Sequence, residues 1–175
     1  MSDQSALLAS IIPLDQVPAE MIEQVLDRAF GPGREERTAY KVREGMDWLP
    51  GLSFAALDED DMLVGTIQAF PVALTDDDGR AHPLIMIGPV AVVPERQDEG
   101  FGRAMMAAQK AAIDPRSPIP QVLIGDEPYY GMFGFVAAPT QKWRLPGPWD
   151  PARLLVRTDN PAILPESGML GPWRG

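Results

Sequence analysis

The sequence predicts one α/β (α+β) domain in which helices flank a central, mostly antiparallel mixed sheet. Three consecutive apolar runs, 52–57, 63–72 and 84–93, are rich in strand-forming residues and are separated by acidic turn sequences. Segments with helical spacing of their apolar residues precede and follow this block. With 175 residues, 45% of them hydrophobic, the chain is long and apolar enough to bury a core of its own.

The N-terminal part predicts an edge strand followed by a helix. The apolar run 7–12 is the strand, and Asp15 and Pro18 signal the start of the helix. Proline suits a first helical turn because its missing N–H would have no partner there. Apolar residues within 22–29 follow with helical spacing, and the glycines of 31–33 end the helix.

The middle of the chain predicts hairpins. Residues 34–44 predict a second, charged helix or helical loop, and the acidic clusters 58–61 and 76–79 predict tight turns that aspartate favours. Such clusters could also bind a divalent cation, but we favour the interpretation that they are solvated turns. Within the run 84–93, Pro89 removes a ladder hydrogen bond, so Gly88-Pro89 marks an edge, a bulge or a point where strands separate.

The C-terminal half predicts a helix over 102–113 and then a strand over 121–125. The helix should bury Ala104, Met105, Ala108 and Ala112 and expose Arg103, Gln109 and Lys110. A short helical turn over 129–133 and late strands over 142–145 and 154–156 follow. We expect a single domain, 1–175, with a core over about 7–157 and a Pro/Gly-rich surface tail over 158–175.

Composition narrows the classes of function. The chain has no cysteine, which excludes disulfides, a cysteine nucleophile and thiolate metal sites, and we expect no metal site. A net charge of -10 without a basic face argues against nucleic acid; the acidic surface gives solubility, or attracts a cationic substrate. Neither a membrane-spanning run of about 20 apolar residues nor a signal peptide is present, so we expect a cytoplasmic protein.

The segment with the strongest chemical signal is the glycine-containing loop 97–102, which leads directly into a helix. The first backbone N–H groups of a helix lack partners within it, and the helix dipole adds positive charge there, so phosphates bind well. Gly100 and Gly102 allow a ligand close to the backbone. The spacing matches neither the dinucleotide fingerprint nor the Walker loop.

Three motifs, in order, surround this loop. They are Val92-Val93-Pro94, Gln97-x-x-Gly100-x-Gly102 and Tyr130-x-x-x-Gly134-Phe135. The combination resembles the GNAT superfamily of N-acetyltransferases, whose sheet is splayed in the middle. The stretch from Ile87 to Val92, together with Gly125-Asp126-x-x-Tyr129-Tyr130-Gly131, further resembles a bacterial subgroup of predicted acetyltransferases.

The resemblance implies an acetyl-CoA-dependent N-acetyltransferase that acts on an amine of unknown identity. The sheet would open between 90–92 and 121–125, with Gly88-Pro89 as the bulge. The pantetheine arm would lie along Val90, Ala91 and Val92, and the pyrophosphate against Gln97, Asp98, Glu99, Gly100, Phe101, Gly102 and Arg103. Phe101 would point into the core. Tyr130 would contact the cofactor and serve as the general acid for the departing thiolate.

Several points stay open from the sequence. The general base is undetermined, and the candidates are His82, Asp126, Glu35, Glu36 and a chain of water molecules. Three tryptophans fit an acceptor pocket, the core or a dimer interface equally well: Trp143, Trp149 and Trp173. The chain would act as a monomer or homodimer. Asp98 and Glu99 depart from the family pattern, because two carboxylates beside a pyrophosphate oppose its binding. These two residues therefore support an alternative hypothesis, that the chain is a degenerate or non-catalytic acyl-CoA-binding or interaction module.

Overall fold

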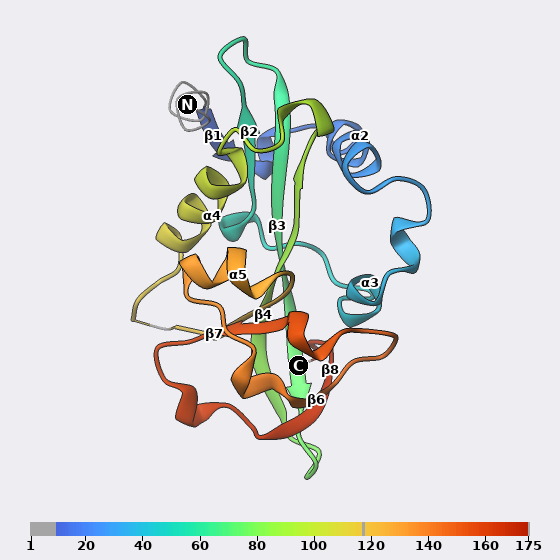
Figure 1. The fold of residues 1–175 in the computed structure, drawn as a ribbon, viewed down its shortest axis with the longest axis vertical. Coiled ribbons are helices and arrows are strands. Elements are labelled where there is room, and N and C mark those ends of the chain that lie inside the picture. Colours follow the sequence, from blue (N-terminus) through green and yellow to red (C-terminus); the bar gives the residue numbers. More distant parts are fainter. Residues whose placement is uncertain (1–9, 117, 175) are drawn as a thin grey trace. The chain divides into compact units, whose positions relative to one another are not determined.

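The structure, a computed structural model, describes residues 10–116 and 118–174 (Figure 1). The strands are β1 (Ser10–Pro13), β2 (Phe54–Leu57), β3 (Leu63–Thr75), β4 (Ala81–Val92), β5 (Gln121–Ile124), β6 (Lys142–Arg144), β7 (Leu154–Arg157) and β8 (Ser167–Pro172). The helices are α2 (Ala19–Phe30), α3 (Thr38–Val42), α4 (Phe101–Ala111) and α5 (Glu127–Tyr130). Short 3₁₀ turns are η1 (Leu14–Gln16), η2 (Arg34–Glu36), η3 (Pro50–Leu52), η4 (Pro94–Arg96), η5 (Gly131–Phe133), η6 (Ala138–Thr140), η7 (Pro151–Arg153) and η8 (Pro161–Ile163).

The strands form an eight-stranded mixed sheet in the order β1-β2-β3-β4-β5-β7, with β8 pairing both β3 and β6. The pairs β1–β2, β2–β3, β3–β8 and β5–β7 are antiparallel, whereas β4–β5 and β6–β8 are parallel. The predicted fold class, a mostly antiparallel mixed sheet flanked by helices, is therefore confirmed. Of the predicted strand 7–12, residues 7–9 lie outside the described part, and the rest falls in β1.

The chain divides into two compact units. The first contains the described residues up to 34 together with 48–69 and 88–113. The second contains 35–47, 70–87 and the described residues from 114 onward. The long strands β3 and β4 contribute residues to both units, because the boundaries fall within them.

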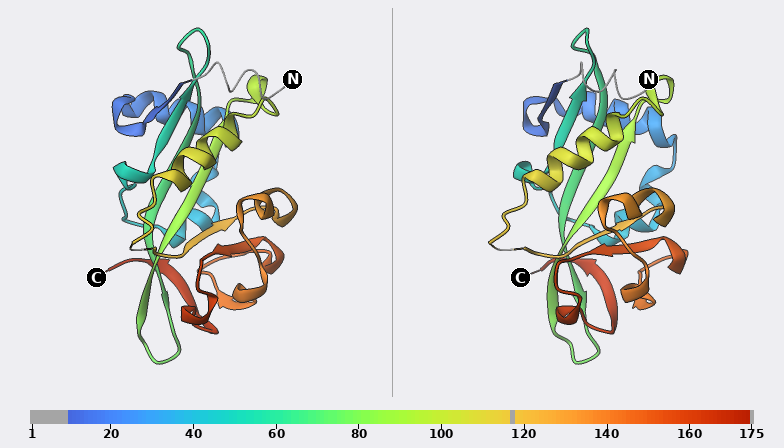
Figure 2. Two further views of the ribbon diagram at one scale, coloured as in Figure 1. Left: turned by 90° about the vertical axis from the view of Figure 1, so that its left-hand side faces the viewer. Right: turned by 60° about the vertical axis from the view of Figure 1, so that its left-hand side comes forward.

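In the first unit, helices α2 and α4 lie on opposite sides of the strands (Figures 1 and 2). Helix α2 buries Ile22, Val25 and Leu26, as its apolar spacing predicts, and ends at Gly31, whose φ is 77°. Helix α4 approaches β3 at Gly65, which has no side chain to hold the helix away from the sheet.

The prediction for the buried face of α4 is partly wrong. The helix begins at Phe101 and buries Phe101, Met105, Met106 and Gln109, whereas Ala112 is exposed beyond its end. Phe101, Met105 and Gln109 are spaced four residues apart and therefore lie on one face. Gln109 is buried although it is polar, and its side-chain amide has no hydrogen-bond partner among the described residues.

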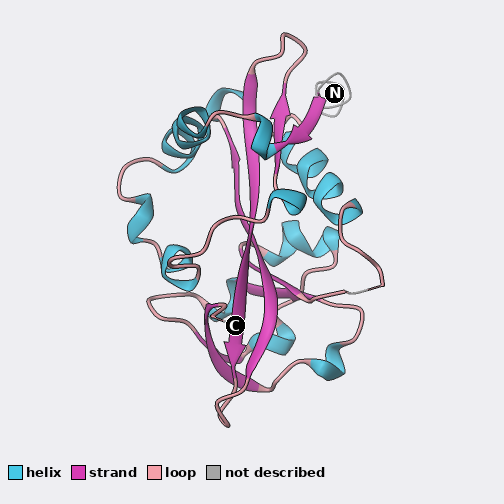
Figure 3. Cartoon of the chain, turned by 180° about the vertical axis from the view of Figure 1, so that it is seen from behind, coloured by secondary structure: helices cyan, strands magenta, loops and turns pink. Residues whose placement is uncertain are grey.

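In the second unit, the expected C-terminal tail supplies a strand instead. Residues 167–172 form β8, which pairs with the far half of β3 and buries Leu170 (Figure 3). Trp143 of β6 belongs to this core, because it is buried and its indole N–H donates to the carbonyl of Pro165 at 2.9 Å. Gly168, Gly171 and Pro172 lie within β8 itself, whereas Pro161 lies in the η8 turn before it.

Both acidic clusters form the predicted hairpin turns. The carboxylate of Asp58 accepts the backbone N–H groups of Asp60 at 2.8 Å and Met62 at 3.0 Å. Asp76 accepts those of Asp78 and Arg80, both at 2.9 Å. The predicted helix over 34–44 is split into η2 and α3.

Strand β4 is irregular where Gly88-Pro89 predicts it. The Gly88–Pro89 peptide bond is cis and the φ of Gly88 is 118°. The described β4–β5 pairing joins Ile85 to Gln121 and Met86 to Val122, so it ends just before this dipeptide. Over the described ranges 10–116 and 118–174, no helix combines the length and apolar character that crossing a membrane requires.

We expect Gly65→Ala to destabilise the fold by about 1–3 kcal/mol, the usual result of overpacking. The added methyl group would lie 2.8 Å from Cε of Met105 and 2.9 Å from the carbonyl oxygen of Ala91. Urea unfolding measures the loss. Gly51→Ala is the matched control, since a methyl group there meets nothing within 4 Å. Equal stabilities of the two variants would contradict close packing of α4 on β3.

Candidate functional site

The loop between η4 and α4 has a backbone conformation that keeps its N–H groups open. Asp98 and Gly100 adopt left-handed conformations, with φ values of 64° and 92°. The N–H of Ala104 donates to the carbonyl of Gly100 at 3.0 Å, which closes the first helical turn. The N–H groups of Asp98, Gly100, Phe101 and Gly102 have no hydrogen-bond partner among the described residues. Together with the helix dipole, this arrangement suits an anion.

The predicted cofactor residues 90–92 and 97–103 all belong to the first unit. The side-chain amide of Gln97 donates to the carbonyl of Val92 at 3.2 Å and so ties the loop to the end of β4. Phe101 is 1% exposed and points into the core, as the family resemblance implies. Asp98 is exposed, so its carboxylate is free to turn toward water.

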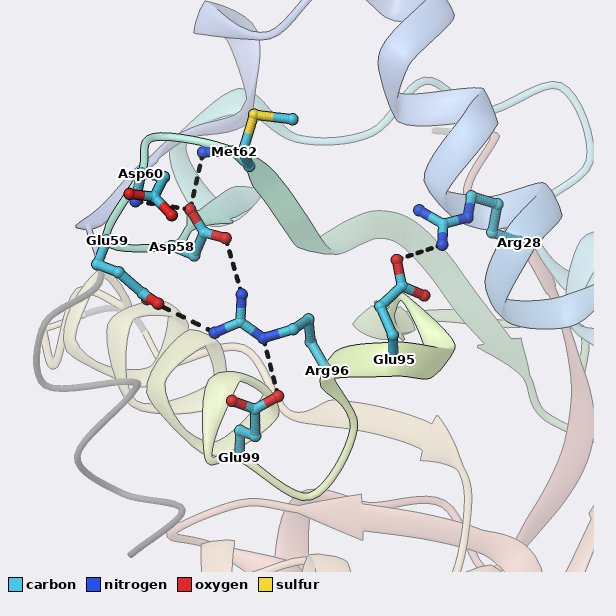
Figure 4. A network of polar contacts seen from close by, with 8 residues as sticks. All are labelled: Arg28, Asp58, Glu59, Asp60, Met62, Glu95, Arg96 and Glu99. Carbon is cyan, nitrogen blue, oxygen red and sulfur yellow. Dashed lines mark hydrogen bonds and ion pairs between the residues drawn. The ribbon is translucent and has the colours of Figure 1, made fainter.

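An ion-pair cluster that the sequence did not reveal lies beside this loop (Figure 4). The guanidinium of Arg96 donates to Glu99 at 2.8 Å and to Asp58 at 2.7 Å. A third carboxylate, that of Glu59, lies 3.5 Å from the same guanidinium. Glu99, expected to oppose an anionic ligand, is therefore paired with a cation of its own chain.

The Tyr130 motif belongs to the second unit and spans α5, η5 and the two residues that follow. Gly134 is left-handed, with φ 93°, and it turns the chain so that Phe135 enters the core. The rings of Tyr130 and Phe135 meet edge to face, with centroids 6.4 Å apart. The pattern Tyr-x-x-x-Gly-Phe thus has a packing explanation: the glycine turn brings the two rings together.

Arg157 supports this motif from β7. It is buried, its guanidinium lies 4.5 Å from the Phe135 ring centroid, and it donates to the carbonyl of Phe133 at 3.2 Å. Its Nε donates to the side-chain oxygen of Gln121 at 2.9 Å. Burial lowers the pKa of Arg157. These contacts hold the η5 turn in place.

Tyr130 is half-buried, and its phenol stays protonated well above neutral pH. Burial, followed by the charges of Tyr129 and Asp126, raises the pKa of Tyr130 to about 12. Gly125 makes room for the ring, since a Cβ at that position would collide with two of its carbons. A phenol that keeps its proton can donate it to a leaving group.

The candidate general bases have other partners or lie on the surface. Nε2 of His82 lies 2.8 Å from the Asp76 carboxylate in the β3–β4 turn. Asp126 pairs with Arg153 at 3.0 Å. Glu35 and Glu36 are exposed in η2. Among the described residues, no group of three or more His, Asp or Glu side chains could hold a metal ion.

A family model for the acetyltransferase (GNAT) domain matches residues 13–138. The chain therefore belongs to the GNAT acetyltransferase family, and the matched stretch includes both the 97–103 loop and Tyr130. Comparison with curated protein sequences gives no match.

Solved structures share the fold. The GNAT family N-acetyltransferase YhbS of Escherichia coli, in complex with CoA, is 22% identical, with 94% of this chain and 89% of that chain covered and a TM-score of 0.71. A GNAT family acetyltransferase of Brucella melitensis, in complex with acetyl-CoA, is 23% identical, with 90% and 92% covered and a TM-score of 0.58. At these identities the likeness establishes the fold.

We expect Gly125→Ala to displace the Tyr130 ring, so that the phenol ionises below pH 12, closer to the ordinary tyrosine value near 10. An ultraviolet absorbance titration measures this, and Tyr130→Phe identifies the contribution of Tyr130. Gly131→Ala is the matched control, because a methyl group there meets nothing within 4 Å. An unchanged titration of Gly125→Ala would show that the ring does not depend on this glycine.

Proposed function

We propose that the chain is an acetyl-CoA-dependent N-acetyltransferase that moves the acetyl group to a primary amine of a small molecule or protein. The observation that carries the proposal is the open loop before α4, in which left-handed Asp98 and Gly100 leave backbone N–H groups without partners. Relatives of the same fold are described in complex with CoA and with acetyl-CoA.

The loop residues fit a pyrophosphate. The N–H groups between Asp98 and Gly102 would bind its oxygens, with Gln97 and Arg103 at either end, and Gly100 allows close approach. The backbone of Val90, Ala91 and Val92 would pair with the pantetheine arm where the family's sheet opens. The end of the β4–β5 pairing at Met86 supports this, because the strand beyond it includes the irregular Gly88–Pro89.

The chemistry assigned to the chain is proton donation and charge stabilisation. The amine nitrogen attacks the thioester carbonyl and a C–N bond forms; the C–S bond then breaks and the sulfur takes a proton. Tyr130 is the proposed donor, since a phenol holds its proton at neutral pH; burial, which raises its pKa to about 12, makes it a weaker acid than an exposed tyrosine. The N–H of Val92 is the proposed partner of the carbonyl oxygen during attack. A water chain is the simplest acceptor for the amine proton, because His82 and Asp126 are each paired with another side chain.

We further propose that residues 1–175 work as one domain in the cytoplasm. The family model includes parts of both compact units, which supports a single functional domain. The absence of cysteine is compatible with a reducing compartment. A monomer and a homodimer are both compatible with this activity.

One observation favours the second candidate, a degenerate or non-catalytic acyl-CoA-binding or interaction module. Asp98 and the Arg96 cluster place more negative than positive charge around the proposed pyrophosphate site. A degenerate member would bind acetyl-CoA weakly or not at all and would release no CoA with any amine. The CoA-release experiment below separates this candidate from the enzyme.

We expect the parent protein to release CoA from acetyl-CoA when offered a suitable amine from a panel, and Tyr130→Phe to lower kcat by about 10²-fold or more. Removal of one phenol oxygen should leave acetyl-CoA binding intact, and the ligand-induced rise in Tm measures this. Tyr40→Phe is the matched control for losing a tyrosine hydroxyl. Equal kcat values for Tyr130→Phe and the parent would reduce Tyr130 to a packing residue. A parent that binds acetyl-CoA but acetylates no amine would favour the non-catalytic candidate.

We expect Asp98→Asn to bind acetyl-CoA a few-fold more tightly than the parent, because it removes about 1 kcal/mol or less of like-charge repulsion at an exposed site. Asparagine tolerates the left-handed backbone equally well. The gain should shrink as salt rises. Isothermal titration at low and high salt measures it. Asp61→Asn is the control, since Asp61 is exposed with φ 60° but lies outside the loop. Weaker binding by Asp98→Asn would give the carboxylate a positive role.

A further inference from the structure

Arg96 is the last residue of η4, immediately before the open loop, and all three of its guanidinium nitrogens face carboxylates. Nε lies 2.8 Å from Glu99, Nη1 lies 2.7 Å from Asp58, and Nη2 lies 3.5 Å from Glu59. The side chains of Arg96 and Asp58 are only 20% and 8% exposed. Figure 4 shows these partners converging from the β2–β3 turn and from the loop itself.

The same guanidinium also touches the start of α4. Its central carbon lies 5.1 Å from the centroid of the Phe101 ring, which is buried. Arg96 therefore contacts both Glu99, within the loop, and Phe101, the first residue of the helix. Because the guanidinium group is planar and rigid, it can make these contacts together only when the loop has one particular conformation.

The preceding residue is anchored from the other side. Glu95 forms an ion pair with Arg28 of α2, and this hydrogen bond holds the pKa of Glu95 below its usual range. The short turn η4 is thus tied to α2 through Glu95 and to the β2–β3 turn through Arg96 and Asp58. Both ties lie within the first unit.

We propose that Arg96 is a positioning residue for acetyl-CoA, which holds the loop open and compensates the charge of Glu99 without binding the phosphates itself. This inference rests on the proposed function of the loop. Because Nε, Nη1 and Nη2 each have a carboxylate partner, the guanidinium is the counter-ion of the loop rather than a phosphate ligand. Its positive charge offsets the negative charge of Glu99 beside the proposed pyrophosphate site.

The charges of the cluster persist at neutral pH. The backbone N–H of Met62, then that of Asp60, then Arg96 hold the pKa of Asp58 below its usual value, despite the opposing effect of burial. The hydrogen bond to Glu99 raises the pKa of Arg96. Because the folded-state pKa of Asp58 is lowered, this contribution is lost only as pH falls through that lowered value.

A double-mutant cycle on Arg96 and Glu99 tests the proposal. We expect Arg96→Gln to raise the Kd of acetyl-CoA about tenfold, because the variant loses one positive charge beside the site of a doubly charged pyrophosphate. In the Glu99→Gln background the same change should raise Kd by about threefold or less, because the carboxylate it compensates is gone. The Kd of Arg96→Lys should lie between those of the parent and of Arg96→Gln, since lysine keeps the positive charge but not the planar guanidinium group with its several donors.

The readouts separate positioning from a general effect on folding. Kd is measured by isothermal titration and KM and kcat by CoA release, and we expect KM for acetyl-CoA to change while kcat does not. Arg116→Gln is the control, because it removes one positive charge from an exposed arginine that pairs only with Asp114 among the described residues. Thermal unfolding without ligand confirms that each variant is folded.

Two results overturn the role of Arg96 alone: a parent-like Kd for Arg96→Gln, or an equal loss of affinity in the presence and absence of the Glu99 carboxylate. If Arg96→Gln does not fold, the same comparison is made with Arg96→Lys, for which parent-like affinity and KM would overturn the role. Failure of the parent protein to bind acetyl-CoA would instead overturn the proposed function, and this inference with it.

Discussion

The first backbone N–H groups of a helix find no acceptor in the helix, and this constraint governs the segment between β4 and α4. A chain that must keep such groups open for a ligand cannot let the loop collapse onto itself. Here Asp98 and Gly100 are left-handed, and their N–H groups make no backbone hydrogen bond within the described part of the chain. Gln97 bonds the end of β4, and Phe101 fixes the start of α4 in the core. The loop is thus anchored on both sides of the open groups.

Electrostatics sets a second condition on the same segment. The chain carries a net charge of -10, and carboxylates reach even the loop proposed to bind an anion. Arg96 balances part of this negative charge by pairing with Glu99 and with Asp58. The carboxylate of Asp58 also accepts two backbone N–H groups of the β2–β3 turn. A buried carboxylate of this kind is stable only with such partners. One guanidinium group, that of Arg96, therefore balances carboxylates of both the hairpin turn and the loop.

The sequence predicted what depends on local pattern and missed what depends on distant partners. Strand runs, acidic turns and the glycine loop can all be recognised within a few residues, whereas the inward position of Phe101 was inferred from the family resemblance. Arg96 was missed because its partner Asp58 lies 38 residues away and no spacing rule joins them. Gln109 was misplaced because a polar residue at a buried helical position contradicts the hydrophobic pattern. Strand β8 was taken for a tail because Gly and Pro signal turns more strongly than Leu170 signals a strand.

Tyr130 shows how packing sets the chemistry available to one phenol. Gly125 leaves space for the ring, Phe135 meets it edge to face, and Arg157 holds the turn between them. The burial that results raises the pKa of Tyr130 to about 12, which makes it a weaker acid than an exposed tyrosine. In the proposed reaction this has a clear consequence. The proton is present at neutral pH, but a thiolate is a weaker base than the phenolate of Tyr130, so a complete proton transfer to the departing sulfur is uphill and the main contribution of the phenol is a hydrogen bond to the negative charge that gathers there.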